Sequence, residues 1–506
     1  MKSYLIHFFR THWDALLASG FAFIWIAYYT AHSGIGISPD SVAYLSTANH
    51  FSDSFQLTDY NNLPLVNFPL GYPLLLGLVK LLFFTEVITA APILNSILLA
   101  AALYTSSYLL LQARIKHGVF RLLILCLILS SPGIVEVYTM LWSETVFIFL
   151  VLIFIATFHQ YLSTEKISWL LLASIIAALA CSVRYVGITL LMTGGISMIF
   201  YFQLNWKTKL KHIAILALIG CSLPVLNIIR NKLLTQTIAG IRQSSLKTVS
   251  SNLQDFVNVL GYWFPNSTND STSTILLIGL VLFIMVIIVF VYRLIQQQFF
   301  ASVITLLSLF VLVYGAFLLF IASVSRFETL SSRLLIPLYI PLVLLIAHCF
   351  YQWMVASRRY KKAFILLVFS VWYAIGANHH YQTHLFNWEG IGYAGIPGYS
   401  DDLWRGSPLL QFMKSHHNNY QAPIYSNAND AVFFLANIKA NPLPHKDLEQ
   451  EIIPFLKHPT IYLVWFEYGK NSDLIDDEYI RTHFKQAKEW QFKDGSIFYF
   501  THTNFQ

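Results

Sequence analysis

The sequence predicts an α-helical protein that crosses a membrane many times and ends in a small polar α/β domain. Hydrophobic residues make up 56% of its 506 residues and charged residues only 11%, with a mean hydropathy of +0.58. Soluble domains carry roughly 25% charged residues, so this composition predicts a membrane protein. The net charge of +7 does not by itself indicate nucleic-acid binding, because in a membrane protein the positions of Lys and Arg along the chain decide their meaning.

Apolar runs long enough to cross a bilayer recur along residues 1–378. A spanning helix needs about 20 mostly apolar residues, and the runs near this length predict about eleven transmembrane helices. They lie near residues 13–31, 88–112, 119–132, 142–161, 167–183, 186–203, 211–229, 274–293, 299–323, 333–354 and 362–378. Residues 70–84 are apolar but number only about 15, which predicts an interfacial or re-entrant juxtamembrane helix.

The positions of the basic residues predict which side of the membrane each loop faces. If residues 70–84 do not cross, the Lys and Arg clusters all fall on one side, and the positive-inside rule makes that side the cytoplasm. These clusters are Lys2 and Arg10; Arg114, Lys116 and Arg121; Lys166; Lys207, Lys209 and Lys211; Arg293; and Arg358, Arg359, Lys361 and Lys362. The sequence therefore predicts a multi-pass protein of the inner (plasma) membrane with a cytoplasmic N-terminus. The predicted extracytoplasmic (periplasmic) parts are the loops 32–87, 133–141, 184–185, 230–273 and 324–332, and the C-terminal tail.

The composition becomes polar from about residue 379, and the tail is long enough for a small domain. Its predicted strands are APIYSN, TIYLVWF and SIFYF, and its predicted helices lie around 404–418, 428–437 and 446–457. This alternation predicts an α/β domain. We therefore divide the chain into a transmembrane domain, residues 1–378, and an extracytoplasmic domain, residues 379–506.

The stretch SPDSVAYLSTANHF, residues 38–51, follows the first long apolar run. Ser38 suits the N-cap of a helix, Pro39 its first position and Asp40 its first turn, where a carboxylate complements the helix dipole. Asp40 therefore either caps a helix at the membrane surface or performs chemistry there, and the two roles are compatible. Tyr44 lies in the same run, which we expect along the membrane surface, and it is a candidate substrate contact.

Other ionisable residues gather on the predicted outer side, where spans emerge. Glu144 begins a span in TMLWSETVFIFL, and Glu136 lies in the short loop before it. The basic members are Arg184, Arg230, Lys232, Arg242, Arg326 and Arg333. Ionisable residues close to a membrane are costly, which makes each a candidate functional residue. Each also has a simpler explanation, because a helix N-terminus attracts a carboxylate and a single Arg can anchor a headgroup.

An anionic ligand at the outer surface would explain why several arginines share this side. Arg binds phosphate bidentately, and an acidic residue beside the phosphate can take a proton from an acceptor hydroxyl. A phosphate leaving group also needs cations as its charge develops. The pattern predicts group transfer from a lipid-linked phosphate donor.

Several motifs together resemble the glycosyltransferase C (GT-C) superfamily, whose members are polytopic enzymes that take sugars from polyprenyl-phosphate carriers. They are the acidic residue in the first loop, the segment NFPLGYPLLLGLV later in that loop, and the acidic SE motif at the start of a later span. The most similar branch is that of the protein O-mannosyltransferases and the bacterial aminoarabinose-type lipid A transferases. The stretches GIRQSSLKTVSSNLQDFVNVLGYWFP, SSRLLIPLYIPLVLL and WRGSPLLQFMKSHHNNYQAPIYSNANDAVFFL also resemble bacterial members.

The resemblance implies a GT-C fold and an inverting glycosyltransferase of the cell envelope that uses a polyprenyl-phosphate sugar. It implies that Asp40 is the general base and that Glu144 orients Asp40 or the sugar. Arg184, Arg242 and Arg333 become candidates for contact with the donor phosphate. The small outer domain would help to bind the acceptor, which is a glycan, a lipid or a protein.

Metal dependence stays open in this sequence. Many relatives carry an acidic pair in the first loop, but here Ser41 follows Asp40, which favours a mechanism with a single base. No metal ligand is predicted, although a divalent cation stays possible as a cofactor. His379, His380 and His384, in NHHYQTH, lack a strong ligand spacing, and we interpret them as an interfacial loop.

Two other functions are consistent with parts of the sequence. An O-antigen ligase or polymerase acting on undecaprenyl-pyrophosphate glycans would also rely on outer arginines, but it typically places them in a large mid-chain periplasmic loop. A transporter or lipid flippase should carry charges or broken helices near mid-membrane and often a repeat. We find neither in the sequence, and a Lys or Arg buried in the middle of a span would favour the transporter.

Overall fold

In the computed structural model, the described residues are 2–201, 203–240, 244–245, 247–264, 272–295, 302–326, 329–416, 420–468 and 471–502. The chain divides into two compact units. The membrane unit comprises Met1–Ala31, Val66–Leu75 and Ala90–Gly390, and the sheet unit comprises His32–Leu65, Leu76–Thr89 and Ile391–Gln506. Most of the predicted first loop therefore belongs to the same unit as the C-terminal segment, whereas Val66–Leu75 belongs to the membrane unit. The domain boundary after residue 378 stays a prediction, whereas the division between the units falls after Gly390.

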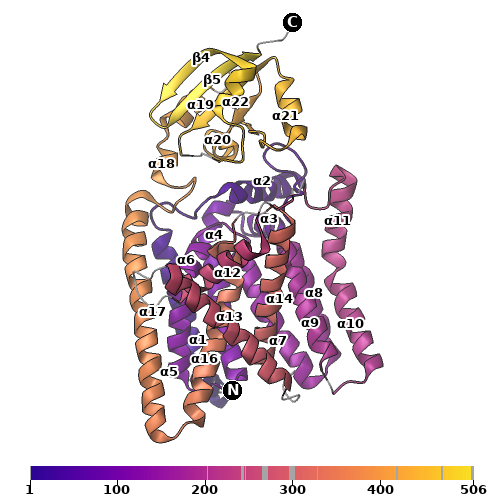
Figure 1. The fold of residues 1–506 in the computed structure, drawn as a ribbon, viewed down its shortest axis with the longest axis vertical. Coiled ribbons are helices and arrows are strands. Elements are labelled where there is room, and N and C mark those ends of the chain that lie inside the picture. Colours follow the sequence, from indigo (N-terminus) through magenta and orange to yellow (C-terminus); the bar gives the residue numbers. More distant parts are fainter. Residues whose placement is uncertain are drawn as a thin grey trace. The chain divides into compact units, whose positions relative to one another are not determined.

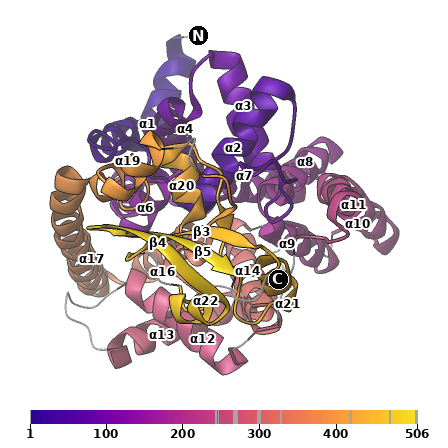
Figure 2. The same cartoon turned by 90° about the horizontal axis from the view of Figure 1, so that it is seen from above.

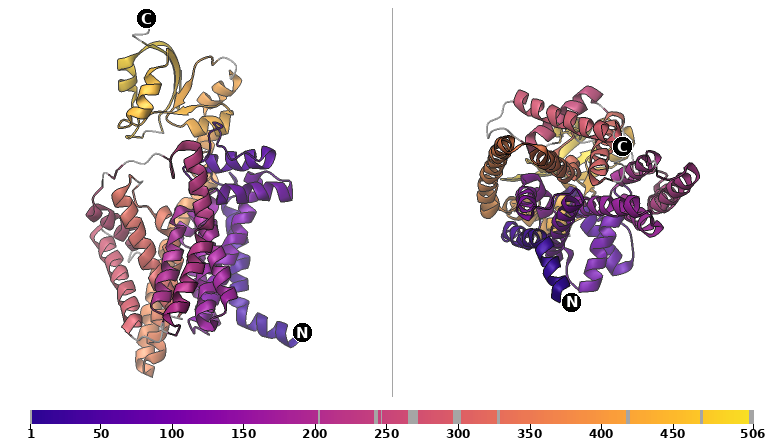
Figure 3. Two further views of the ribbon diagram at one scale, coloured as in Figure 1. Left: turned by 90° about the vertical axis from the view of Figure 1, so that its right-hand side faces the viewer. Right: turned by 90° about the horizontal axis from the view of Figure 1, so that it is seen from below.

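The membrane unit is helical (Figure 1). Its elements are α1 Lys2–Tyr29, α4 Val87–Gln112, α5 Gly118–Leu129, α6 Pro132–Thr139, α7 Glu144–Thr164, α8 Ile167–Val183, the 3₁₀-helix η1 Tyr185–Gly187, α9 Ile188–Ile199, α10 Trp206–Gly220, α11 Ser222–Thr235, α12 Val249–Trp263, α13 Thr272–Ile295, α14 Val303–Val324, α15 Ser332–Leu335, the 3₁₀-helix η2 Ile336–Leu338, α16 Tyr339–Ala356 and α17 Arg359–Ala394. Helix α7 packs against α8, α9 and α14, and α9 packs against α8 and α14; the view from above labels these helices (Figure 2), and Figure 3 gives two further views of the helices.

Six helices of the described residues are long and apolar enough to cross a membrane, or up to eight if each of two bent pairs counts as one span. The protein is therefore a multi-pass membrane protein. The count of eleven spans is not confirmed, because some predicted spans form shorter helices, such as Ile167–Val183 and Tyr185–Ile199. The predicted juxtamembrane segment forms α3 (Gly71–Phe83). At about 1.5 Å per residue α3 is roughly 20 Å long, less than the roughly 30 Å of a hydrocarbon core.

Prolines explain the two bent pairs. Helices α5 and α6 meet at 60°, and α10 and α11 meet at 44°. Pro132 occupies the start of α6, where its ring cannot continue the hydrogen bonding of α5 but suits the first turn of a new helix. Pro224 lies in the first turn of α11 and likewise lacks the N–H that would bond to the preceding turn.

The histidines of NHHYQTH lie inside helix α17 rather than in an interfacial loop, so that interpretation was wrong. His384 Nε2 contacts the backbone oxygen of Ser130 at 2.6 Å, and its Nδ1 is bonded to the Tyr29 hydroxyl. His380 Nδ1 is bonded to Ser130 Oγ at 3.0 Å. These bonds fasten α17 to the ends of α1 and α5, which lets a polar stretch remain helical.

Two polar contacts of α4 mark opposite ends of the membrane unit. Near the start of α4, Asn95 Nδ2 donates to the backbone oxygen of Met140 at 3.0 Å, close in sequence to Glu144. Nearer its end, Ser107 Oγ donates to Asp14 Oδ2 at 2.6 Å. The helical rise separates Asn95 from Ser107 by about 18 Å. Glu144 and Asp14 therefore lie at opposite ends of the helical bundle.

The sheet unit contains α2 Pro39–Ser54, α18 Asp402–Arg405, α19 Pro408–Ser415, β1 Ile424–Ser426, α20 Asn429–Ala436, β2 Asn441–Pro442, α21 Glu449–Leu456, β3 Thr460–Phe466, α22 Asp477–His483, β4 Phe484–Phe492 and β5 Gly495–His502. The strand order is β2-β1-β3-β5-β4, with β2, β1 and β3 parallel and β5 antiparallel to both β3 and β4. The small C-terminal α/β domain of the predicted fold class is therefore confirmed.

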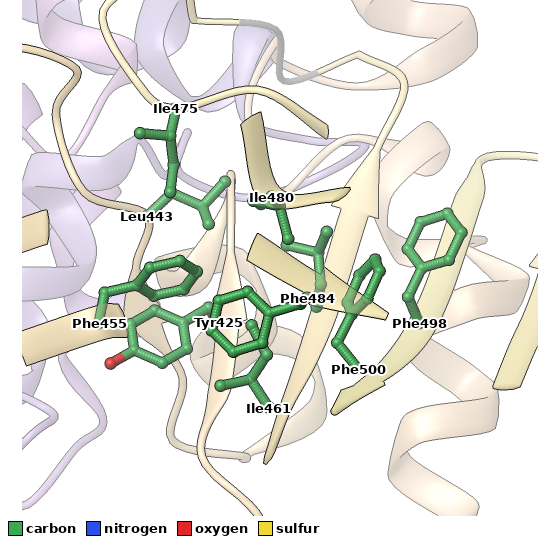
Figure 4. Close-up of a cluster of buried hydrophobic side chains, with 10 residues drawn as sticks. Tyr425, Leu443, Phe455, Ile461, Ile475, Ile480, Phe484, Phe498 and Phe500 are labelled. Carbon is green, nitrogen blue, oxygen red and sulfur yellow. The ribbon is translucent and has the colours of Figure 1, made fainter. Parts of the chain in front are cut away.

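Aromatic side chains fill one face of this sheet. Phe455, Phe484, Phe498 and Phe500 are buried together with Ile461 (Figure 4). The predicted strands correspond to β1, β3 and β5, whereas the two-residue strand β2 and the longer strand β4 were missed. Its sequence FKQAKEWQF is polar at most positions and largely exposed, as in an edge strand, so the apolar strand signal is absent there.

Candidate active site

Glu144 is held by two arginines that come from different helix ends. Its Oε1 forms an ion pair with Arg184 Nη1 at 2.7 Å and accepts a hydrogen bond from Arg333 Nε at 2.9 Å. The Glu144 side chain is 1% exposed, whereas the two arginine side chains are 18% and 19% exposed. A buried carboxylate needs such partners. We call Glu144, Arg184 and Arg333 the Glu144 cluster.

The backbone conformation at Arg184 places its side chain in this cluster. Arg184 lies between α8 and η1 in an extended conformation, with φ −146° and ψ 134°, so the chain turns at this residue. The turn is tight, since a Cβ on Gly187 would lie 2.5 Å from the backbone of Ala180. Arg184 Nη1 also donates to Ser143 Oγ at 3.0 Å, which ties the end of α8 to the start of α7.

Arg333 is positioned by stacking and by the support of its own short helix. Its guanidinium carbon lies 4.1 Å from the ring centroid of Trp142, a cation–π geometry. Trp263 Nε1 donates to Ser332 Oγ at 2.8 Å, and the Tyr314 hydroxyl donates to the backbone oxygen of Leu334 at 2.9 Å. These bonds on either side of Arg333 fix the backbone of α15.

The Glu144 cluster carries a net charge of +1 when its three members are ionised. Glu136 on α6 interacts electrostatically with both Arg333 and Glu144, so a second carboxylate lies close to the cluster. Two partly exposed guanidinium groups held by one buried carboxylate form a fixed cationic surface, which suits a phosphate oxyanion.

The other predicted arginines are placed differently. Arg230 on α11 donates from Nη1 to Asn231 Oδ1 at 3.0 Å. Asn231 is fully buried, and its Nδ2 donates to the Tyr185 hydroxyl at 3.3 Å. Arg230 is therefore linked, through Asn231 and Tyr185, to the turn that contains Arg184. Asn231 and Tyr185 were not among the residues predicted from the sequence, although Tyr185 adjoins Arg184 in the SVRYVG motif.

Arg326 follows the end of α14, and Arg242 lies outside the described residues. Ser325, which precedes Arg326, forms a β-bridge with Ser244, and the Ser245 N–H donates to the backbone oxygen of Val324 at 3.2 Å. Residues 244 and 245 therefore lie along the end of α14 that leads to Arg326.

A cavity of about 390 Å³ is lined in part by Ser332, which precedes Arg333 in the sequence. Among the described residues its lining includes Asp255, Asn258 and Tyr262 of α12. Lys247 Nζ pairs with Asp255 Oδ2 at 2.7 Å. The volume lies within the range of small-ligand sites, roughly 300–1,000 Å³.

Asp40 belongs to the sheet unit, and the predicted helix start is present there. Pro39 is the first residue of α2 and Asp40 lies in its first turn. The Ser38 N–H donates to Ser41 Oγ at 3.1 Å, and the two hydroxyl oxygens lie 3.0 Å apart. Asp40 is half-buried, and Tyr44 is buried at 3% exposure. The capping arrangement fixes the position of Asp40 at the helix N-terminus.

The described residues contain no group of three or more His, Cys, Asp or Glu side chains arranged for a metal ion. The possible divalent cation therefore stays a prediction.

Neither the protein-family models nor the curated proteins give any match to this chain. Solved structures do match. ArnT from Cupriavidus metallidurans in the apo state superposes with a TM-score of 0.54 at 10% identity, over 96% of this chain and 98% of ArnT. The same protein bound to undecaprenyl phosphate gives a TM-score of 0.55 at 11% identity, over 96% and 97% of the two chains.

A second solved protein extends the likeness beyond ArnT. The oligosaccharyltransferase of Archaeoglobus fulgidus, in complex with zinc and sulfate, gives a TM-score of 0.52 at 11% identity. The match covers 88% of this chain and 68% of that chain. At such low identities these matches show the fold. The fold predicted from the sequence resemblance is confirmed: this chain has the fold of the GT-C glycosyltransferases.

Proposed function

We propose that this protein is a membrane glycosyltransferase that transfers a sugar from a polyprenyl-phosphate donor to an acceptor hydroxyl at the outer face of the membrane. The GT-C fold supports this class, and ArnT, which shares the fold, binds undecaprenyl phosphate. The observation that carries the proposal is the Glu144 cluster, in which two arginines meet one buried carboxylate where helices end.

The cluster would bind the donor phosphate and stabilise it as the leaving group. In the proposed step the acceptor oxygen forms a bond to the anomeric carbon of the sugar while the bond from that carbon to the phosphate oxygen breaks. The electron pair leaves with the polyprenyl phosphate, whose added negative charge Arg184 and Arg333 would stabilise. The proton of the acceptor hydroxyl passes to a general base, for which Asp40 is the candidate. Attack of the acceptor oxygen on the face of the anomeric carbon opposite to the leaving phosphate gives inversion.

The distribution of charge supports an outer location for this chemistry. Arg121 and its partner Asp14 lie at the end of the bundle opposite to Glu144. Arg293 and Arg114 also interact with each other, and both belong to the predicted cytoplasmic clusters. By the positive-inside rule that basic end faces the cytoplasm, with the N-terminus, so the Glu144 end would be periplasmic, as would the C-terminal domain.

The buried Arg121 does not favour the transporter alternative. It is 2% exposed but lies in the first turn of α5, at a helix end, and its Nε donates to Asp14 Oδ2 at 2.8 Å. Its Nη1 and Nη2 donate to the backbone oxygens of Lys116 and Thr11. Such a satisfied ion pair locks the helix ends together, whereas a transporter would need charges that face a pathway.

The test is donor turnover by the purified, full-length protein. We expect wild type to release polyprenyl phosphate from at least one member of a panel of polyprenyl-phosphate sugars when acceptor lipids or glycans are added. Formation of polyprenyl pyrophosphate from a pyrophosphate-linked glycan instead would favour the ligase or polymerase and overturn the proposal.

Asp40→Asn tests the base, with Asp53→Asn as the matched control on the same helix. Asp53 is exposed at the end of α2 and pairs with Lys80 at 3.3 Å, so its loss should leave turnover unchanged. General-base catalysis contributes typically 10²–10⁴-fold, and we expect Asp40→Asn to lose on the order of 100-fold or more. Normal transfer by a folded Asp40→Asn protein would remove Asp40 from the role of base.

A further inference from the structure

A buried amide on α4 holds the chain that leads into the Glu144 cluster. Asn95 is fully buried, and its Nδ2 donates to the backbone oxygens of Tyr138 at 2.9 Å and Met140 at 3.0 Å. These two oxygens belong to the end of α6 and the chain up to α7, residues 138–143, which we call the connector. An amide nitrogen carries two hydrogen atoms to donate, so Asn95 fixes the connector at two points.

The conformation of the connector makes these bonds necessary. Met140 directly follows α6 and is extended, with φ −105° and ψ 154°. The last carbonyl groups of a helix have no partner inside the helix, and Tyr138 and Met140 are buried, so their oxygens need a donor from another segment. Asn95 supplies this donor. Beyond them, Thr145 Oγ1 donates to the backbone oxygen of Trp142 at 3.0 Å, so the connector is held near both ends.

Three successive side chains at the end of the connector contact the two arginines of the Glu144 cluster. The Trp142 ring centroid lies 4.1 Å from the guanidinium carbon of Arg333. Ser143 Oγ accepts a hydrogen bond from Arg184 Nη1 at 3.0 Å. Glu144 pairs with both arginines. The backbone that Asn95 fixes therefore determines where both guanidinium groups lie.

The Asn95 side chain contributes through its nitrogen rather than through its oxygen. Its Oδ1 is buried and has no hydrogen-bond partner among the residues that the structure describes. An unpaired buried polar atom lowers stability, whereas the Asn95 nitrogen satisfies two backbone oxygens of the connector. The contribution of Asn95 is therefore the fixed geometry of the connector.

We propose that Asn95 is a positioning residue for the donor phosphate site, which acts by fixing the connector and, through it, the guanidinium groups of Arg184 and Arg333. The inference rests on the proposed function, in which these two arginines bind the phosphate. Groups of a binding site must be held within about 0.5 Å of their productive positions. Loss of the amide would let the connector move, and misplacement of a site by about 1 Å can lower the rate on the order of 100-fold.

The experiment compares Asn95→Ala with Ser96→Ala in the purified, full-length protein. Ser96 is the matched control because it is the next residue of α4, is 4% exposed, and donates from Oγ to the backbone oxygen of Pro92 in its own helix at 2.8 Å. Steady-state kinetics with donor and acceptor varied in turn are expressed per folded molecule. We expect Asn95→Ala to lower kcat/KM for the donor by about tenfold or more with an unchanged KM for the acceptor. Ser96→Ala should leave both constants unchanged.

A second comparison asks whether Asn95 acts through Arg333. In an Arg333→Ala background, Asn95→Ala should lower kcat/KM for the donor by a smaller factor than in wild type, because one of the groups that it positions is absent. Asn95→Ser keeps a hydroxyl donor and should lose less than Asn95→Ala, and it replaces Asn95→Ala in every comparison if that variant does not fold. An unchanged kcat/KM for the donor, an equal loss in Ser96→Ala, or losses that multiply in the double variant overturn the inference.

The thermal unfolding midpoint separates this inference from the proposed function. We expect Asn95→Ala to lower the midpoint by different amounts in wild type and in Arg333→Ala, because Asn95 and Arg333 contact the same connector. Ser96→Ala should lower it equally in both. Equal falls for Asn95→Ala overturn the inference. If wild type turns over no donor, the proposed function fails on its own, while the midpoints still decide whether Asn95 positions Arg333.

Discussion

Arg333 Nε donates to Glu144 Oε1 at 2.9 Å and joins the start of α7 to the short helix before α16. The same oxygen forms an ion pair with Arg184, which follows α8. One carboxylate thus gathers three helix ends that are far apart in the sequence. Because the two guanidinium groups are partly exposed while Glu144 is buried, the cluster presents its positive charge outward and keeps its negative charge inside.

Replacement of Arg333 by Ala should mainly weaken use of the phosphate donor. Loss of one preorganised donor to a developing anion typically costs on the order of 100-fold in rate, and we expect a loss of this size in kcat/KM for the donor. Arg333→Lys should restore little, because Lys lacks the planar group that stacks on Trp142. Steady-state kinetics with varied donor at fixed acceptor measure the effect. An unchanged donor dependence in Arg333→Ala would remove this residue from the phosphate site.

The ion pairs of Glu144 should also be visible in stability. Glu144→Ala leaves two arginines without their buried counter-charge, and breaking a buried pair costs about 3–5 kcal/mol. We expect a clear fall in the thermal unfolding midpoint of the purified protein. The double variant Glu144→Gln with Arg333→Gln should lose less than the sum of the two single variants, because each single change leaves a charge unpaired. Additive losses would mean that the pair contributes no coupling energy.

The sequence revealed the members of the Glu144 cluster because each is an ionisable residue where an apolar run begins or ends. The helix start at Asp40 could be predicted for a similar reason, since Ser38 and Pro39 act within one turn. The residues that contact these segments from elsewhere in the chain could not be predicted. The Tyr399 N–H bonds to the backbone oxygen of Ile37 just before α2, and α20 packs against α2, but no local sequence pattern predicts such contacts. Helix α17 continued past its apolar part because His384 finds partners on α1 and α5, which a hydropathy profile does not detect.

The buried pair Asp14 and Arg121 should affect stability more than chemistry. Both side chains are almost fully buried, and Asp14 also accepts from Ser107. We expect Asp14→Asn to lower stability by about 3 kcal/mol, while the folded fraction keeps wild-type transfer rates because the pair lies at the end of the bundle opposite to Glu144. The control Asp477→Asn loses an exposed pair with Arg481 at 2.7 Å and should change stability by less than about 1 kcal/mol. A large loss of rate per folded molecule in Asp14→Asn would connect this end to the reaction.

Cysteine labelling in cells tests the orientation on which the outer location of the chemistry depends. Lys116 is exposed between α4 and α5, at the end that carries Asp14 and Arg121, so Lys116→Cys should resist a membrane-impermeant thiol reagent until the membrane is opened. Lys446→Cys, exposed in the sheet unit, should react from outside in intact cells because the C-terminal segment is predicted to be extracytoplasmic. Cys126 is exposed in α5, so both variants are made in a background with Cys126→Ser. Labelling of Lys116→Cys from outside would mean that residues 70–84 cross the membrane, and the Glu144 cluster would then face the cytoplasm.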